Sequence, residues 1–249
     1  TLPYNDIESV EDTFLSKGDQ IAAVIIEPIA GNMGVILPED GFLETLRNVT
    51  NKYGALLIFD EVITGFRVDY GGAQKIFNIK PDLTCLGKVI GGGLPVGAFG
   101  GQLDIMKNMA PLGTVYQAGT LSGNPIAMAA GLKSLELLCA EGLHDELEAK
   151  SKAICEGFEA AAKKAGIALT TNYAGGMYGF FFTDKEKVTS YQQATECDLE
   201  RFKKFFHLML EEGVYLAPSA FEAGFVCAEH SEKEINDTIA AAERAFAKL

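Results

Sequence analysis

Two charged residues, Asp60 and Lys88, each follow a short run of residues that can form a strand. Asp60 comes after residues 55–59, and Lys88 comes after residues 84–87 and shortly before three consecutive glycines. A carboxylate can hold the proton of a heteroaromatic nitrogen, and a lysine amine can react with an aldehyde. Pyridoxal phosphate (PLP) carries both a pyridine nitrogen and an aldehyde, so one cofactor can engage both side chains.

The elements that must position these two residues follow the pattern of a parallel sheet. Residues 21–26 and 55–59 are continuous apolar runs, which predict strands that are buried on both faces. A helix expected over residues 41–53 joins them, so this unit is a right-handed strand–helix–strand crossover. Further strands are expected over residues 82–86 and 96–101. Ligands of such open sheets bind where the strands end, which is where Asp60 lies.

The second part of the chain also alternates helices and strands, but in shorter pieces. Asn124 followed by Pro125 predicts the start of a helix. Ser231 with Glu234 three residues later predicts a capping box at the last helix. The other helices are expected over residues 5–16, 143–165 and 199–212, and the short strands over residues 167–171, 177–182, 214–216 and 225–227. The fold class predicted from these patterns is α/β, with a smaller second domain starting at residue 141.

The composition excludes several classes of function. The 249 residues carry a formal net charge of −13 and show no basic stripe, so we expect no nucleic-acid partner. No run approaches the roughly 18 apolar residues that span a bilayer, so we expect no membrane partner. Five scattered cysteines without a CxxC pair are typical of a reducing compartment and predict a cytoplasmic protein. The three histidines lack the spacing of metal ligands, so no metal site is expected.

Four stretches of the sequence together resemble one enzyme family. The first stretch covers residues 60–101: it begins with DEVITGFR, and 28 positions after Asp60 it contains Lys88 within LGKVIGGGLPVGAFGG. This pair resembles the class III, fold-type I PLP-dependent enzymes. The stretches EPIAGNMG (27–34), GTLSGNP (119–125) and PSAFEAGF (218–225) are similar to motifs of the glutamate-1-semialdehyde 2,1-aminomutases within that group. The resemblance covers nearly the whole chain.

The resemblance implies a role for each residue around the cofactor. Lys88 would be the Schiff-base lysine and the main proton shuttle, and Asp60 would pair with the pyridinium nitrogen. Val62 would pack against a face of the ring, where its β-branched side chain is stiff. Glu27 would lie near the cofactor and help to order Asn32 or Lys88. Glu222 would lie on the substrate side.

Further roles concern the polar groups that surround the ring and its phosphate. Many class III aminotransferases have a glutamine where this chain has Ile63, and we infer that Asn32 is the polar group on that side. Gly119 and Thr120 would reach the phosphate of the neighbouring subunit's cofactor, which implies a homodimer. Arg67 is compatible with a structural position or with one near the cofactor.

The family layout also implies what lies outside this chain. A Ser/Gly-rich phosphate-binding loop, an aromatic residue that stacks on the ring and a mobile lid are expected upstream of Thr1. The chain is therefore expected to be the C-terminal part of a longer polypeptide and to have the N-terminal portion of the same enzyme as a partner. Residues 1–140 would be the C-terminal part of the large PLP-binding domain, and residues 141–249 the small α/β domain.

The reaction implied is an intramolecular amino transfer. The pyridoxamine phosphate form of the cofactor would convert glutamate-1-semialdehyde, (S)-4-amino-5-oxopentanoate, to 5-aminolevulinate in tetrapyrrole biosynthesis. One alternative is a class III ω-aminotransferase with a separate keto-acid acceptor; Ile63 and the scarcity of arginines after Arg201, where only Arg244 follows, argue against it. A more distant alternative is a non-catalytic module with the same fold, and the presence of both Asp60 and Lys88 argues against that.

Overall fold

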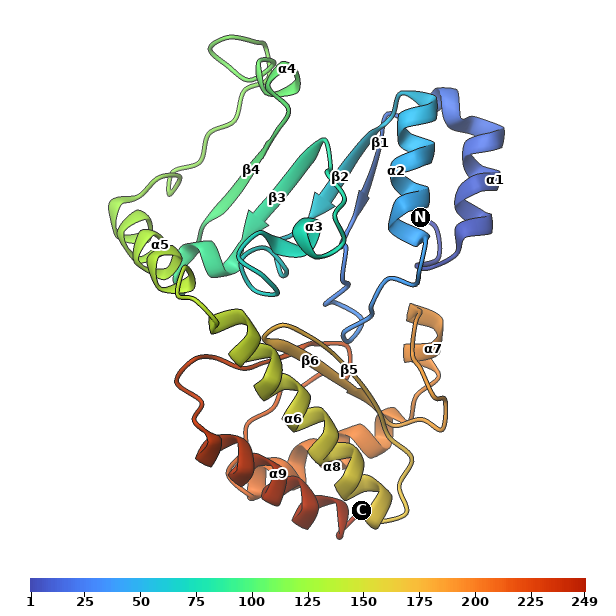
Figure 1. The fold of residues 1–249 in the computed structure, drawn as a ribbon, viewed down its shortest axis with the longest axis vertical. Helices are drawn as coiled ribbons and strands as arrows, with labels where there is room; N and C mark the ends of the chain where they lie inside the picture. The colour runs from blue at the N-terminus through green and yellow to red at the C-terminus, as the bar shows by residue number, and fades with distance from the viewer.

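The computed structural model describes residues 1–249 and contains two separate sheets, one above the other in Figure 1. The first sheet consists of β1 (Ala23–Ile26), β2 (Leu56–Asp60), β3 (Leu83–Gly87) and β4 (Gly97–Gly101), in that order. The first three strands are parallel, and β4 is antiparallel to β3. The predicted α/β class with a mostly parallel sheet is confirmed.

Two helices of the first part form within two residues of the expected ranges, 5–16 and 41–53, and a third begins at Pro125 as expected. The helices of this part are α1 (Ile7–Lys17), the 3-10 turn η1 (Gly18–Gln20), α2 (Phe42–Tyr53), α3 (Gly72–Ile76), the 3-10 turn η2 (Lys88–Gly91), α4 (Leu103–Met106) and α5 (Pro125–Leu138). The side chain of Asp6 caps α1 by accepting from the backbone of Ser9, and Asn124 caps α5 by accepting from Ala127. Helices α1 and α2 pack their apolar faces on Leu57 of β2.

The prediction that residues 21–26 are buried on both faces is wrong. Strand β1 is the edge of the sheet and is only four residues long. Val24 and Ile26 contact the cluster under α1 and α2, whereas Ile25 points the other way and is 61% exposed. Successive strand side chains face opposite sides, so helices on one side cover only alternate residues.

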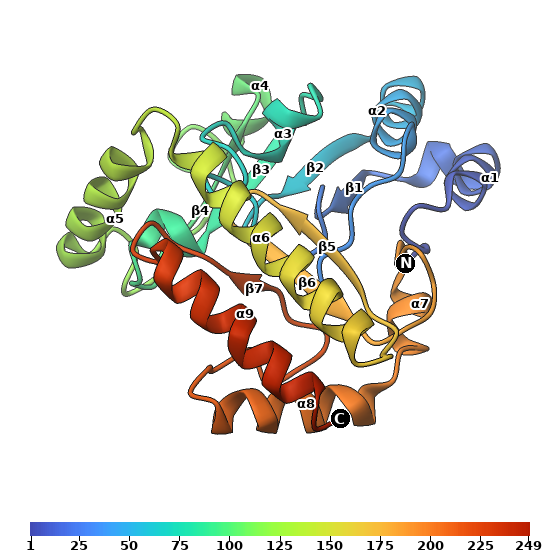
Figure 2. The same cartoon turned by 60° about the horizontal axis from the view of Figure 1, so that its bottom comes forward.

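The second sheet is antiparallel. It contains β5 (Thr170–Ala174), β6 (Met177–Phe181) and the short β7 (Gly224–Phe225), in that order. The helices around it are α6 (Leu143–Lys164), α7 (Tyr191–Thr195), α8 (Leu199–Glu211) and α9 (Glu232–Phe246). Figure 2 shows α6 and α9 side by side across this sheet. The strand expected over residues 214–216 does not form, and the strand expected over residues 167–171 begins later, at Thr170.

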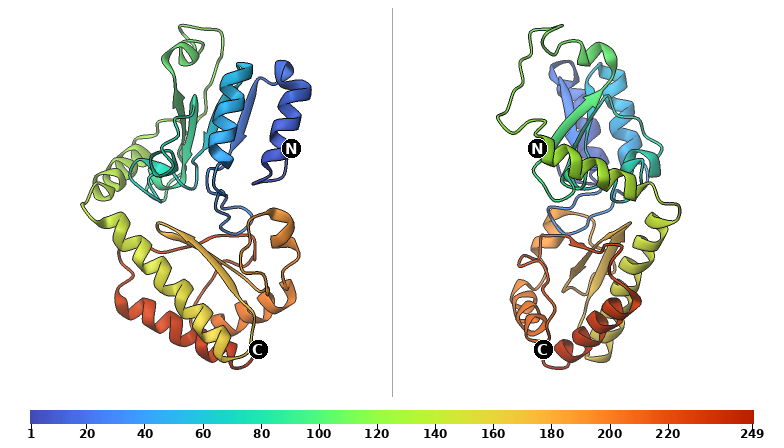
Figure 3. Two further views of the ribbon diagram at one scale, coloured as in Figure 1. Left: turned by 45° about the vertical axis from the view of Figure 1, so that its right-hand side comes forward. Right: turned by 90° about the vertical axis from the view of Figure 1, so that its left-hand side faces the viewer.

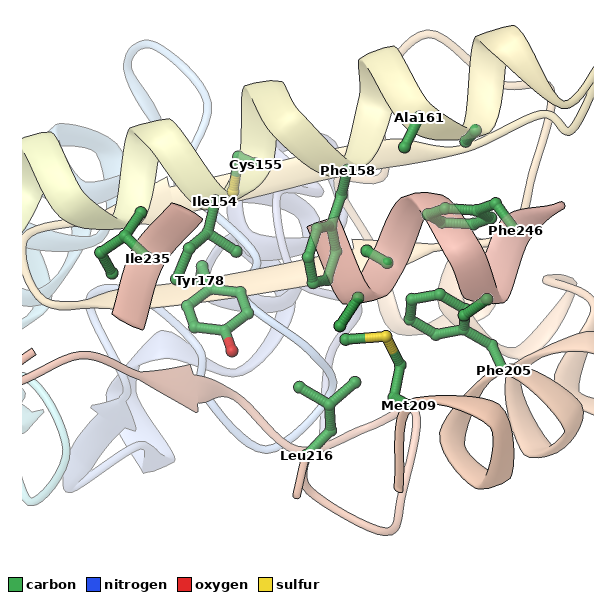
Figure 4. Close-up of a cluster of buried hydrophobic side chains, with 14 of the residues drawn as sticks. Ile154, Cys155, Phe158, Ala161, Tyr178, Phe205, Met209, Leu216, Ile235 and Phe246 are labelled. Atoms are coloured by element: carbon green, nitrogen blue, oxygen red, sulfur yellow. The ribbon is translucent and has the colours of Figure 1, made fainter. Parts of the chain in front are cut away.

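The second part is built around a cluster of phenylalanines. Phe158 from α6, Phe205 from α8 and Phe246 from α9 are fully buried, and the rings of Phe205 and Phe246 stack with centroids 4.5 Å apart (Figure 4). The predicted capping box of α9 is present, because Ser231 and Glu234 satisfy each other's backbone. These helices therefore give β5 and β6 a rigid support.

The loop that follows β1 connects the two sheets. Ile29 and Val35 from this loop lie in one buried cluster with Ile63 of the first part and Met177 of β6. Gly34 has a left-handed φ of 82°, and a Cβ atom there would lie 2.5 Å from the Phe181 ring. Only glycine fits this turn, which brings the loop onto β6.

The segment between β4 and α5, which carries α4, extends away from the two sheets (Figure 3). Its large apolar side chains are mostly exposed, among them Leu112 and Tyr116. No helix of the chain combines the length and the apolar character that crossing a membrane requires. The division into domains at residue 141 stays a prediction.

Candidate active site

Three charged residues lie at the carboxyl ends of the three parallel strands of the first sheet. Glu27 follows β1, Asp60 ends β2, and Lys88 follows β3. The strand register pairs Ile26 with Phe59 and Asp60 with Cys85, so the three strands end at nearly the same level. The carboxyl ends of parallel strands are where open α/β sheets bind ligands. The fold therefore gathers the residues that the sequence singles out as chemical.

Asp60 keeps most of its hydrogen-bonding capacity available. Its Oδ1 accepts a bond of 3.1 Å from the backbone N–H of Val62, and no group of the chain bonds its Oδ2. Burial and the negative charge of Asp60 raise the pKa of the neighbouring Cys85 thiol, in that order of size. Cys85 therefore stays a neutral thiol beside the carboxylate and does not compete with it for a cation.

Lys88 is exposed and forms neither an ion pair nor a hydrogen bond with the chain. Its backbone has a φ of 47°, in the left-handed region that non-glycine residues seldom occupy. Such strain often marks functional positions. Its side chain faces a hollow of about 680 Å³, which is lined by Arg67, Lys88, Val89, Gly92, Gly93, Leu94, Pro95 and Ser134.

Glu27 holds the loop that carries Asn32. Its Oε2 accepts a 3.0 Å bond from the backbone of Gly31, and its Oε1 accepts a 3.0 Å bond from the Asn32 side-chain amide. The Tyr4 hydroxyl donates to the backbone carbonyls of Glu27 and Pro28, both at 3.1 Å. Burial, followed by the charge of Glu27, raises the pKa of Tyr4, so its hydroxyl remains a donor. Glu27 thus orders Asn32, as the resemblance implies, whereas no bond joins Glu27 to Lys88.

Ile63 and Asn32 occupy different environments. Ile63 is only 5% exposed and lies in the cluster between the sheets, where it contacts the loop at Gly31. Asn32 is exposed at the end of that loop, and its side-chain carbonyl has no partner in the chain. Ile63 therefore packs against the buried side of the loop, whereas the exposed Asn32 can reach a ligand.

Val62 and Gly119 line a second, larger hollow of about 1240 Å³ beside the first. A Cβ atom on Gly87 would lie 3.2 Å from the Val62 side chain, so Val62 packs closely against the residue before Lys88. Gly119 and Thr120 are both exposed on the extended segment, and Thr120 does not line the hollow that contains Lys88. The predicted contact of these two residues with a phosphate stays a prediction.

Glu222 is exposed on the loop before β7. The neighbouring Phe221 accepts a 2.8 Å bond at its carbonyl from the backbone of Gly34. This bond joins two of the four stretches that carry the resemblance and places Glu222 next to the loop of Asn32. Its substrate-side role stays a prediction.

Glu61 is a buried residue whose structural role the sequence pattern did not reveal; its side chain is 1% exposed. Its carboxylate accepts bonds from the Thr64 hydroxyl (2.9 Å), the backbone of Ala73 (2.6 Å) and the Gln74 side chain (3.0 Å). These bonds tie the segment after β2 to the start of α3. In the sequence, only its place directly after Asp60 could have indicated this role.

We expect the substitution Glu61→Gln to lower the free energy of unfolding by about 2 kcal/mol, because an amide nitrogen would face buried donors. Urea denaturation measures this change. Glu11→Gln, at an exposed position of α1, is the matched control and should shift stability by less than about 0.5 kcal/mol. A Glu61→Gln loss no larger than the control's would contradict the inferred anchoring.

Arg67 is the second residue whose place the sequence left open. Its Nε donates a 3.0 Å bond to the carbonyl of Ile63, and its guanidinium lies 4.2 Å from the centre of the Phe225 ring. Burial lowers the pKa of Arg67. The structure places Arg67 in the same hollow as Lys88. It also joins the run that begins at Asp60 to the one that ends at Phe225.

These residues fit the donor set that PLP requires. Asp60 offers an unoccupied carboxylate oxygen at one strand end, and Lys88 offers an unpaired amine at the next. Val62 lies close to the backbone before Lys88 and provides an apolar, branched surface beside them. A carboxylate for a protonated ring nitrogen, an amine for an aldehyde and an apolar face for a ring match the chemistry of that cofactor.

Comparisons with known proteins agree with this geometry. The family model described as Aminotransferase class-III matches residues 2–231. The chain is similar to an ω-transaminase from Sphaerobacter thermophilus (31% identity, TM-score 0.91) and to a β-phenylalanine aminotransferase from Variovorax paradoxus (30%, 0.86). Each similarity covers 98% of this chain and 56% of the other. The chain thus spans little more than half the length of these proteins.

A glutamate-1-semialdehyde aminomutase from Pseudomonas aeruginosa PAO1, solved in complex with PMP, is also similar. The similarity covers 100% of this chain and 56% of that one, with a TM-score of 0.87. Its sequence identity of 20% shows a shared fold and no more. Together these structures confirm the predicted fold class.

Proposed function

Because the chain belongs to the class III aminotransferase family, we propose that it supplies the catalytic lysine and aspartate of a PLP-dependent aminomutase. The reaction proposed is the intramolecular amino transfer that converts (S)-4-amino-5-oxopentanoate to 5-aminolevulinate. The observation that carries the proposal is the pair Asp60 and Lys88, both without ionic partners, at the ends of adjacent parallel strands. PLP, when bound, supplies the group that carries the amine and a ring that accepts electrons.

Each residue of the site has a defined task in this proposal. Asp60 accepts a hydrogen bond at Oδ2 and thereby holds a proton on the ring nitrogen. Lys88 would move a proton between the cofactor and the substrate carbon that gains or loses the amine, once in each half of the transfer. Val62 supports the ring from one face. Glu27 keeps Asn32 in place through the 3.0 Å bond, so that the Asn32 carbonyl can orient a polar group of the ligand.

Motifs, rather than overall identity, favour the aminomutase. The stretches 27–34 and 218–225, which resemble the aminomutase motifs, are joined in space by the bond from Gly34 to Phe221. Ile63 replaces the glutamine of many class III aminotransferases and supports the Asn32 loop from within an apolar cluster. Asn32 is then the polar group available on that side.

An ω-aminotransferase with a separate keto-acid acceptor is the second candidate. The higher identities, 31% and 30%, are with an ω-transaminase and a β-phenylalanine aminotransferase. Asp60 and Lys88 would serve that reaction equally well, because both reactions need proton transfer between substrate and cofactor and a ring that accepts electrons.

A homodimer is part of the proposal. Gly119 and Thr120 lie on the segment that extends from the sheets, and Leu112, Tyr116 and Leu121 on it are largely exposed. Exposed apolar patches of this kind mark interaction surfaces. A second copy packed there would bring the Thr120 hydroxyl toward the partner's cofactor phosphate.

The stoichiometry of product formation tests the proposed reaction. The holoenzyme in its amine form is mixed with glutamate-1-semialdehyde, with no other amino donor or acceptor. An aminomutase regenerates its amine form, so we expect many equivalents of 5-aminolevulinate per active site. A transaminase would instead release about one equivalent of 4,5-diaminovalerate and little 5-aminolevulinate, and an added amino donor would restore turnover to the diamine. The absence of any product from a protein that carries PLP would favour a non-catalytic module.

A further inference from the structure

Arg67 lies in the hollow of Lys88 with no acidic partner. No carboxylate of the chain forms an ion pair with it, and the only side-chain bond is from Nε to the Ile63 carbonyl. Its two terminal nitrogens make no hydrogen bond and remain accessible to solvent. A half-buried guanidinium without a counter-charge is unusual, because burying a cation is unfavourable unless it is paired.

The guanidinium is nevertheless held in one orientation. The bond from Nε, at 3.0 Å, fixes one edge, and the Phe225 ring, 4.2 Å away, covers one face. Both contacts leave the outer edge, with the two terminal nitrogens, directed away from the protein groups that hold it. A planar fork of N–H donors matches a carboxylate, which it can bind through two parallel hydrogen bonds.

The charges around the hollow select for an anion. Its eight lining residues include two cations, Arg67 and Lys88, and no acid. The proposed function assigns Lys88 to the cofactor, so Arg67 is the cation left for another ligand. The volume of about 680 Å³ is in the range of small-molecule sites.

We propose that Arg67 binds the carboxylate of the substrate and so determines that this site takes amino acids rather than simple amines. This inference rests on the proposed function for its choice of substrate. It adds a positioning residue to the site: the carboxylate at Arg67 fixes the distance of the reacting carbon from Lys88. Arg67 thus acts in binding, and Lys88 in proton transfer.

The test compares an acid with its uncharged analogue on the holoenzyme. Pentanoate and pentanamide have the same length and react with neither the lysine nor the cofactor, so calorimetry measures binding without turnover. We expect the wild type to bind pentanoate at least 10-fold more tightly than pentanamide. Arg67→Gln should reduce the affinity for pentanoate by about 10- to 100-fold and leave that for pentanamide within about threefold, as expected for a lost charged hydrogen bond.

Two further variants separate binding from structural support. Arg67→Lys keeps the charge without the fork and should recover part of the preference for the acid. The matched control is Arg201→Gln. It removes an arginine of α8 that pairs with Asp198, and the variant should bind both compounds like the wild type. In turnover, Arg67→Gln should raise KM by about 10- to 100-fold and change kcat much less, because it removes uniform binding.

Several outcomes would overturn the inference. The first is a wild-type protein that binds pentanoate no more tightly than pentanamide. The second is an Arg67→Gln variant that still prefers pentanoate. The third is an Arg67→Gln variant whose affinity falls equally for both compounds. A variant that binds pentanoate normally but retains PLP poorly would assign Arg67 to the cofactor phosphate and also reject the inference. An Arg67-dependent preference in a protein that forms no product would support the carboxylate site while rejecting the proposed reaction.

Discussion

Substitution of Lys88 by alanine is expected to lower kcat by on the order of 10⁴-fold, the largest effect of any single change in this chain. Lys88 is the only lysine in its hollow, and no other residue there can accept a proton near neutral pH. The side chain makes no contact that stabilises the fold, so the protein should remain folded. Product assays in single-turnover mode would measure the loss, because they report proton transfer without interference from product release.

Two controls make this result specific. Lys80→Ala removes an exposed lysine whose side chain forms no ion pair, and it should leave kcat unchanged. Lys88→Arg retains the positive charge but remains protonated, so it should be as inactive as alanine. Borohydride treatment followed by mass spectrometry should find PLP attached to position 88 in the wild type and in the Lys80 variant only. PLP attached elsewhere, or a Lys88→Ala variant with more than about a tenth of the wild-type kcat, would refute the assignment.

The second large effect is expected for Asp60→Asn, which should lower kcat by about 10²- to 10³-fold. An opposite charge within about 4–6 Å favours the protonated form of its partner by roughly one to three pKa units, and each unit corresponds to a factor of ten. Asparagine keeps the oxygen that accepts from Val62, so the local backbone should not change. Steady-state kinetics and a thermal unfolding curve, measured together, separate chemistry from stability.

A cofactor analogue provides the sharpest control for Asp60. PLP methylated at the ring nitrogen keeps a positive charge that needs no carboxylate to hold it. It should restore activity to Asp60→Asn and bring no gain to the wild type. Failure of the analogue to restore a well-folded variant would mean that Asp60 does not act by holding a proton on the ring nitrogen.

Local signals in the sequence were sufficient to predict where most of the longer helices lie and which charged residues lie at the strand ends. The caps at Asn124 and Ser231 lie where the residue types predict them, because a cap depends only on groups within three residues along the chain. The strands that end at Asp60 and precede Lys88 were predicted to within one residue from their sequence pattern. Short strands, such as the one expected over residues 214–216, depend on a partner strand and were missed.

Residues whose roles depend on distant contacts could not be assigned in this way. The burial of β1 was overestimated, because the number of layers that cover a sheet is not encoded in one strand. The sequence showed only that Ile63 replaces a glutamine; its packing in one cluster with Met177, more than a hundred positions away, appears only in the structure. Glu61 received no role at all until its buried donors were visible.

The sequence by itself therefore identified the two residues on which the proposed chemistry depends, Asp60 at one strand end and Lys88 at the next. Only the tertiary structure decided what surrounds them. It placed Arg67 beside Lys88 and held its guanidinium against Phe225, 158 positions later in the chain. The physical reason is that the type and local geometry of a residue depend on its near neighbours. Its burial, its unpaired charge and its ligand depend on segments that only folding brings together.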